Sequence, residues 1–420
     1  MNFKIFLCLI FTSIVISNSL YAQDFKRTSP DIYYMLQCQK AVNQLIGEKK
    51  IQFSPDQIYF RCFSLQKKIK LVPKESRKLD LDPIEKIIWQ RMNHFTSFFD
   101  ACAKGNIEQI KELLKKKWVE LEDRDSIGWT ALMHASYSGQ IKVVKLLIGK
   151  GANPYALNDA EMNALMLASI NGRIAVMNFL LRKDKERIND IDKMRNMTAL
   201  QWAIDSGQLD AVEFLLEKGA DLHVKNISEK DALMLAAGKG YLEIVKMLVE
   251  READVHARDR WGNTALMHAA EQGGIHVAKV LLDNDADIYA VDERGDTVLM
   301  HAVYGKKLDL IEYVLMQGAD IDVVNRYNSS ALLMAAKTGD FEIANYLIDQ
   351  KANIHFSSVD DGTALIWAAA WNEFDLVKRL VEMGADLDAK NRDGETALKM
   401  AEDRKYADIA QYLRDQGAQN

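Results

Sequence analysis

Hydrophobic and polar positions follow one pattern that recurs along most of the chain, and residues 259–287 show it clearly. A short run rich in alanine and leucine covers 265–270, and a run with Ile, Val and Leu at helical spacing covers 275–282. Thr264, directly before the first run, is a residue type that often caps a helix. The pattern predicts two short helices, entered through a polar turn and followed by an extended segment.

This pattern repeats along the sequence with a nearly constant period. When the repeats are aligned on one position of the short run, every interval is 33 residues except one, which is 35. The aligned positions are Ala131, Ala164, Ala199, Ala232, Ala265, Val298, Ala331, Ala364 and Ala397. One such helix pair cannot bury its apolar side alone, whereas stacked copies can. We therefore predict an all-α solenoid of about nine to ten helix-turn-helix units, the first of them degenerate.

The repeat resembles the ankyrin repeat. The stretch TALMHA at 130–135 is similar to the family's T-P-L-H-x-A start, and Gly151-Ala152-Asn153 is similar to its G-A-D/N end. Every unit has alanine or valine where the family has proline. Proline suits a first helical position but is not required there. The resemblance covers 98–420 and implies an ankyrin-repeat solenoid that binds proteins through its turn tips and first helices.

The remaining chain divides into three parts. Residues 1–22 have one cation, an apolar run and a small-residue end, which together indicate a secretory signal cleaved after Ala22. The alternative is an uncleaved anchor, although the apolar run is shorter than the roughly 20 residues that span a bilayer. Residues 23–80 are expected to form a small helical extension, and 81–97 a helix that caps the array 98–420.

Export changes how the cysteines are interpreted, because an oxidising compartment permits disulfides. Cys38 and Cys62 lie in two short predicted helices of the extension, and we expect a bridge between them. The alternative is two buried free thiols. Cys102 has no evident partner in the sequence.

The charge is unevenly distributed. The whole chain has a net charge of −6, whereas residues 23–80 carry 12 Lys or Arg and 6 Asp or Glu. The acidic remainder would repel nucleic acid and anionic lipid, so neither is expected as a partner. The basic extension could touch an anionic surface or dock on the acidic array.

Histidine recurs at one position of the repeat, in His134, His268 and His301. Other units have leucine, methionine or tryptophan there, and stacked units lie about 10 Å apart, so a shared metal site is not expected. The resemblance implies that this histidine forms hydrogen bonds within the turn. A second column, with His223, His256, His355, Tyr155 and Tyr289, is interpreted as solvated loop side chains, with protonation near pH 6 as a means of tuning the surface.

The sequence has no HExxH, paired CxxC, P-loop or GxSxG motif. We therefore expect no enzymatic activity, no catalytic residue, no metal, no cofactor and no small-molecule substrate. Function is expected to come from a surface that binds a protein.

Aromatic residues and arginine supply much of the energy of protein interfaces. At the turn tips and the ends of the first helices, the candidate partner-binding residues are Trp129, Tyr137, Arg260, Trp261, Arg294, Tyr304, Arg326, Tyr327 and Trp371. Five of these come from three consecutive units and could form one patch: Trp261, Arg294, Tyr304, Arg326 and Tyr327. The alternative is that some of these rings pack between repeats.

These observations lead to a non-enzymatic, exported scaffold for protein–protein interaction, located in the periplasm or secreted. Two alternatives remain open: an effector delivered to a host, and a protein that inhibits or stabilises a periplasmic enzyme by covering it. A eukaryotic origin would make Asn196, Asn226 and Asn328 glycosylation acceptors, because each lies in an N-x-S/T sequence.

Overall fold

A computed structural model describes residues 83–358 and 362–419 of the chain. Regular structure in this part is almost entirely helical, so the predicted all-α repeat fold is confirmed. The chain forms two compact units, which are described separately. Of the described residues, unit 1 comprises 83–168 and 175–183, and unit 2 comprises 169–174, 184–358 and 362–419.

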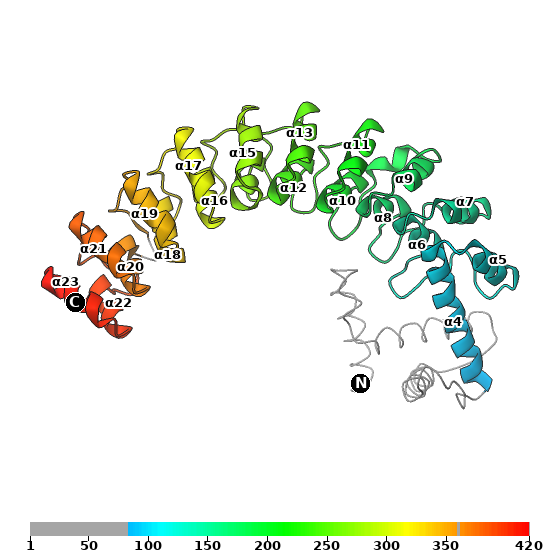
Figure 1. The fold of residues 1–420 in the computed structure, drawn as a ribbon, viewed down its shortest axis with the longest axis horizontal. Helices are drawn as coiled ribbons and strands as arrows, with labels where there is room; N and C mark the ends of the chain where they lie inside the picture. Colours follow the sequence, from blue (N-terminus) through cyan, green and yellow to red (C-terminus); the bar gives the residue numbers. More distant parts are fainter. Residues whose placement is uncertain (1–82, 359–361, 420) are drawn as a thin grey trace. The chain divides into compact units, whose positions relative to one another are not determined.

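Each repeat consists of a first and a second helix, which lie side by side in Figure 1. The first helices are α6 (Ala131–Tyr137), α8 (Ala164–Ile170), α10 (Ala199–Asp205), α12 (Ala232–Lys239), α14 (Ala265–His268), α16 (Val298–Tyr304), α18 (Ala331–Thr338), α20 (Ala364–Ala370) and α22 (Ala397–Asp403). The second helices are α5 (Ile107–Lys115), α7 (Ile141–Gly149), α9 (Ile174–Leu181), α11 (Leu209–Glu217), α13 (Leu242–Glu250), α15 (Ile275–Leu282), α17 (Leu308–Met316), α19 (Phe341–Asp349), α21 (Phe374–Glu382) and α23 (Ala407–Asp415).

The first helices begin where the sequence predicts, because a side chain caps each described start. Thr264 accepts a hydrogen bond from the backbone N–H of Met267 at 3.4 Å, and Thr130, Thr297, Thr363 and Thr396 cap their helices in the same way. Capping satisfies one of the backbone N–H groups that a helix start leaves free. The repeat motif therefore fixes where each short helix begins.

Small residues on the first helices allow neighbouring units to pack closely. In unit 2, α10, α12, α14, α16, α18, α20 and α22 pack in sequence order, first helix against first helix. Ala265, Leu266, Ala269 and Ala270 are buried in this packing, and Leu281 of the second helix is fully buried. The core of unit 2 is thus continuous through the repeats, as expected for a stacked array.

Unit 1 begins with α4 (Pro83–Lys104), which packs on α5 and α6. The sequence predicts a capping helix that ends at residue 97, but α4 continues without a break through Phe98 to Lys104. The capping helix and the first helix of the degenerate unit are therefore one helix. Cys102 lies on it as a buried free thiol, and burial raises the pKa of this thiol well above its usual range.

The connections between repeats are short and contain little strand. The two-residue insertion forms the 3-10 turn η2 (Glu186–Asn189), and one turn tip forms a two-residue antiparallel pair, β1 (Ser357–Ser358) with β2 (Gly362–Thr363). In α14 the helix continues into the π-helical turn η3 (Ala269–Gly273). The insertion therefore stays outside the helix pairs, and the period of the packing is kept.

The predicted signal at 1–22, the extension at 23–80 and the Cys38–Cys62 bridge lie outside the described residues. Within the described ranges, none of the helices combines the length and the apolar character needed to cross a bilayer.

Candidate protein-interaction surface

The turn tips of unit 2 are joined to one another by backbone hydrogen bonds. The N–H of Glu293 donates to the carbonyl oxygen of Trp261 at 2.9 Å, and the N–H of Arg326 donates to the carbonyl oxygen of Arg294 at 2.9 Å. Gly262 has φ of +81°, and a Cβ there would lie 3.0 Å from the nitrogen of Glu293, so glycine permits this close approach. Neighbouring tips are consequently held in a fixed register.

This register brings together most of the residues that the sequence analysis assigned to one patch. Trp261, Arg294 and Tyr327 occupy the same position in three consecutive tips, and Arg260, Glu293 and Arg326 occupy the position before it. We call these six residues the tip row. The side chains of Trp261 and Tyr327 are 50% and 51% exposed, so the aromatic rings are available to a partner.

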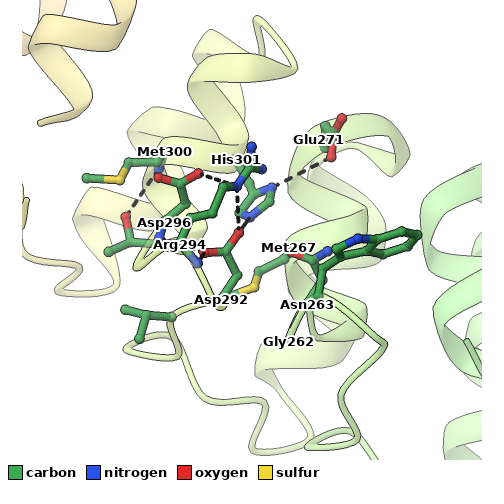
Figure 2. A network of polar contacts seen from close by, with 12 residues as sticks. Gly262, Asn263, Met267, Glu271, Asp292, Arg294, Asp296, Met300 and His301 are labelled. Carbon is green, nitrogen blue, oxygen red and sulfur yellow. Dashed lines mark hydrogen bonds and ion pairs between the residues drawn. The ribbon is translucent and has the colours of Figure 1, made fainter. Parts of the chain in front are cut away.

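Arg294, in the middle of the tip row, is held by two buried carboxylates. Its Nε lies 3.6 Å from Oδ2 of Asp292 and 3.4 Å from Oδ2 of Asp296, and its side chain is 56% exposed (Figure 2). Burial opposes the positive charge, but Asp296 and Asp292 outweigh this effect and raise the pKa of Arg294. The two buried carboxylates thus orient the guanidinium, and more than half of the side chain remains exposed to solvent.

A side-chain network extends from Arg294 to the next tip. Nδ2 of Asn325 donates to Oδ1 of Asp296 at 2.6 Å, and Oδ1 of Asn325 accepts the backbone N–H of Tyr327 at 2.9 Å. Asp296 therefore contacts both Arg294 and the residue that shapes the following tip. The positions of Arg294 and Tyr327 are coupled through buried groups and not only through the backbone.

Two further predicted residues lie at the ends of first helices. Tyr304 is exposed at the end of α16; burial and nearby Asp296 raise the pKa of its phenol, while Arg294 opposes them. Trp371 follows α20, and its indole Nε1 donates to the carbonyl oxygen of Lys337 at 3.1 Å while the ring stays about half exposed. Tyr304 thus borders the tip row beside Arg294. Trp371 belongs to a later repeat than the residues of the tip row.

Unit 1 requires a correction to the predicted surface. Trp129 is only 8% exposed, because its ring packs against His134 and Tyr137 at centroid distances of 5.1 and 5.2 Å. Tyr137 is half-buried in the same cluster. The ring of Trp129 therefore packs against side chains of its own repeat and offers little surface to a partner.

The recurring histidine of the motif is a structural residue of the turn. Nε2 of His268 lies 2.9 Å from Oδ2 of Asp259, and Nε2 of His134 lies 2.9 Å from Oδ2 of Asp125. In each case the carboxylate belongs to the turn nine residues earlier and also accepts backbone N–H groups of that turn. The hydrogen bond implied by the family resemblance is thus present.

Tryptophan replaces histidine in one repeat without loss of the contact. Nε1 of Trp202 donates to Oδ2 of Asp192 at 3.0 Å. Units with leucine or methionine at this position have asparagine in the turn instead; the pairs are Asn158 with Leu167, Asn226 with Leu235, Asn325 with Met334 and Asn391 with Met400. The aligned repeats display this correlation between the two positions, which the histidine column alone does not reveal.

His301 has a different environment. It is 3% exposed and lies between two carboxylates, with Nε2 3.6 Å from Asp292 and Nδ1 3.6 Å from Glu271 of the preceding repeat (Figure 2). Interaction with His301 lowers the pKa of Glu271. This imidazole therefore joins η3 to the buried carboxylates beneath Arg294.

The second histidine column is exposed, as predicted. The backbone N–H of His223 donates to Asp221, and that of His256 donates to Asp254, in turns that follow the second helices. Tyr289, at the equivalent place, is 67% exposed. Over the residues that the structure describes, no three His, Cys, Asp or Glu side chains are arranged to hold a metal ion.

Comparison with known proteins agrees with this architecture. The family described as "Ankyrin repeats (3 copies)" matches residues 76–158, 150–226, 233–325, 286–358 and 332–420, so the chain belongs to the ankyrin-repeat family. Proteins of this family are scaffolds for protein–protein interaction, and their repeats generally carry no catalysis.

Similar proteins share the repeats but differ in length. The chain is 34% identical over 122 residues to protein glp-1 of Caenorhabditis elegans, covering 28% of the chain and 9% of that protein. It is 28% identical over 163 residues to putative ankyrin repeat protein R791 of Acanthamoeba polyphaga mimivirus, covering 36% and 53%. Over 131 residues it is 32% identical to ankyrin repeat and KH domain-containing protein mask-1 of C. elegans, covering 31% and 5%. The chain thus spans about half or less of each of these relatives.

Proposed function

We propose that the tip row is the surface through which this scaffold holds a protein partner. The observation that carries the proposal is the register of Trp261, Arg294 and Tyr327, which adjacent backbone hydrogen bonds hold side by side. Exposed aromatic rings and guanidinium groups are the side chains that most often dominate binding energy. Tyr304 borders the same surface and extends it along α16.

The rigidity of the tip row favours binding. Association costs the ordering of side chains and loops at the interface, and a surface that is ordered beforehand avoids part of that cost. Asp292, Asp296 and Asn325 order Arg294 and the tip of Tyr327 in the absence of a partner. The tip row is therefore suited to bind with little rearrangement.

The test compares two variants in partner capture from an extract of the source organism. Trp261→Ala/Tyr327→Ala removes both exposed rings of the tip row, and Tyr289→Ala removes an exposed ring from the loops after the second helices. We expect the first variant to lose at least about tenfold in partner affinity and the second to bind as the unchanged chain does. Equal capture by a folded double variant would refute the proposed surface.

We also propose that the chain is exported, on the basis of the signal-like residues 1–22. Mass spectrometry of the mature protein in fractionated cells tests this proposal. A chain that begins at Gln23 and is found in the periplasm fits a periplasmic scaffold or a protein that inhibits or stabilises a periplasmic enzyme. The same chain found outside the cell fits an effector. A cytoplasmic chain that keeps its first residues contradicts export.

A further inference from the structure

The tip row has a distinctive charge pattern. Arg260, Arg294 and Arg326 are exposed there, with Glu293 as the exposed carboxylate of the row. The loops after the second helices of unit 2 are acidic at the corresponding position of five repeats. These exposed residues are Asp221, Asp254, Asp287, Asp320 and Asp386. The two surfaces of the same repeats thus present opposite charge to a partner.

The end of the Arg294 side chain is exposed. Among the described residues, Nε is the atom that pairs with Asp292 and Asp296, and Nη1 and Nη2 belong to a side chain that is 56% exposed. These two amino groups form the end of a planar fork that matches a carboxylate in two parallel hydrogen bonds. Because Asp292 and Asp296 already fix the Nε side, the fork is oriented before a ligand arrives.

In the part of the chain that the structure describes, the side chain of Arg260 makes one long ion pair. Its Nε lies 3.8 Å from Glu229, and both side chains are more than half exposed. A pair of this kind contributes little stability and exchanges readily for another carboxylate. The guanidinium of Arg260 can therefore turn toward a partner that lies along the tip row.

We propose that the tip row binds an acidic segment of the partner protein, with one carboxylate of that segment on Nη1 and Nη2 of Arg294. The rings of Trp261 and Tyr327 pack against the apolar side chains next to this carboxylate. The inference rests on the proposed function, and it adds the chemistry of the partner.

Electrostatics favours a narrow segment over an extended anionic surface. A membrane or a nucleic acid would bring dense negative charge against the acidic loops of the same unit, whereas a peptide segment can lie along the tips alone. The acidic loops would also repel a misplaced acidic segment. Charge complementarity thus directs the partner to the tip row.

The test selects peptides from a random 12-residue display library on the full chain. Parallel selections use Arg294→Gln, Arg294→Lys and Trp261→Ala/Tyr327→Ala, with Lys246→Gln on α13 as a matched surface control. We expect Asp and Glu to be enriched in peptides selected by the unchanged chain and by the control, and the enrichment to disappear with Arg294→Gln. Arg294→Lys should restore little of it, because an ammonium group lacks the fork.

Affinity measurements on the selected peptides complete the test. Replacing the essential Glu of a peptide by Gln should weaken binding to the unchanged chain roughly tenfold or more, but should have little effect on Arg294→Gln. Peptides that need Trp261 and Tyr327 but show no acidic enrichment would overturn the inference and leave the proposed function intact. Acidic peptides that bind regardless of Arg294, Trp261 and Tyr327 would overturn both.

Two further outcomes count against the inference alone. If no peptide is selected, an isolated acidic segment is not the ligand, while partner capture still tests the surface. If phosphatidylserine vesicles bind the unchanged chain but not Arg294→Gln, the anion is a lipid and the acidic segment is refuted.

Discussion

Nε2 of His268 lies 2.9 Å from Oδ2 of Asp259, and both residues are buried. Burial opposes ionisation of Asp259, but hydrogen bonds from His268 and from the backbone N–H groups of Asn263 and Trp261 outweigh it and lower the pKa of this carboxyl. The pair therefore holds the turn from Asp259 to Asn263, which contains the tip residue Trp261. The histidine of the TALMHA motif acts on the tip through this carboxylate.

The correlation between the two positions predicts a compensating pair of substitutions. His268→Leu alone should lower the free energy of unfolding by about 1–3 kcal/mol, because it leaves a buried carboxylate without its partner. Asp259→Asn combined with His268→Leu should recover most of the loss, because asparagine and leucine already occur together in other repeats. Urea unfolding of the unchanged chain, of His268→Leu, of Asp259→Asn and of the double variant measures the coupling. Additive losses would contradict the pairing.

The two tryptophans of the same column provide a matched comparison. The Nε1–H of Trp202 donates to Asp192, whereas Nε1 of Trp367 is buried and has no hydrogen-bond partner among the described residues. Trp202→Phe should cost about 1–2 kcal/mol more than Trp367→Phe, because both lose the same volume but only the first loses a hydrogen bond to a charged group. Thermal unfolding of both variants measures the two losses of stability. Equal losses would show that the side-chain volume matters and the hydrogen bond does not.

The backbone of the π-helical turn η3 lies so close to Gly305 that no larger residue fits there without a shift. A Cβ at Gly305 would lie 2.3 Å from the carbonyl oxygen of Glu271. Gly305→Ala should therefore destabilise unit 2 by about 1–3 kcal/mol. Gly149→Ala, where a Cβ has open space, should be neutral or slightly stabilising. If both variants unfold at the same urea concentration, the close approach at Gly305 is absent in solution.

Acid should weaken unit 2. The pKa values of Asp259 and Glu271 are both below their ordinary range, so the folded state favours their ionised forms. Their contribution is fully present above the unfolded value of about 4, and it is lost as pH falls through the folded pKa. The urea midpoint should drop between pH 6 and pH 3, and Asp259→Asn/Glu271→Gln should drop less. An unchanged pH slope in the double variant would assign the effect to other carboxylates.

The sequence was sufficient to predict the fold, because period, caps and helix pattern all specify the same unit. Thr264 as N-cap, the buried Ala265 and the helix over 275–282 follow from local rules that each repeat obeys. The end of the predicted capping helix was wrong, because nothing at residue 97 stops a helix that has Phe98 as its next buried contact. Where buried contacts continue along a segment, a continuous helix has a lower free energy than a helix that is interrupted.

The interaction surface was only partly predictable. Exposure of Trp261 and Tyr327 follows from their position at the tips, but Trp129 occupies the same kind of tip and is buried by His134 and Tyr137. The difference depends on which side chains face the ring, which spacing does not reveal. The sequence also did not reveal the hydrogen bond from Asn325 to Asp296, the residue that pairs with Arg294, because Asn325 lies in the next repeat.

Site-specific photo-crosslinking tests the central claim most directly. A benzophenone amino acid is placed at Tyr327 in the tip row or at Tyr289 in the loops after the second helices, two exposed tyrosines of the same unit. The account predicts that the partner crosslinks to position 327 and not to position 289. Crosslinking at 289 alone, or with equal yield at both positions, would contradict it.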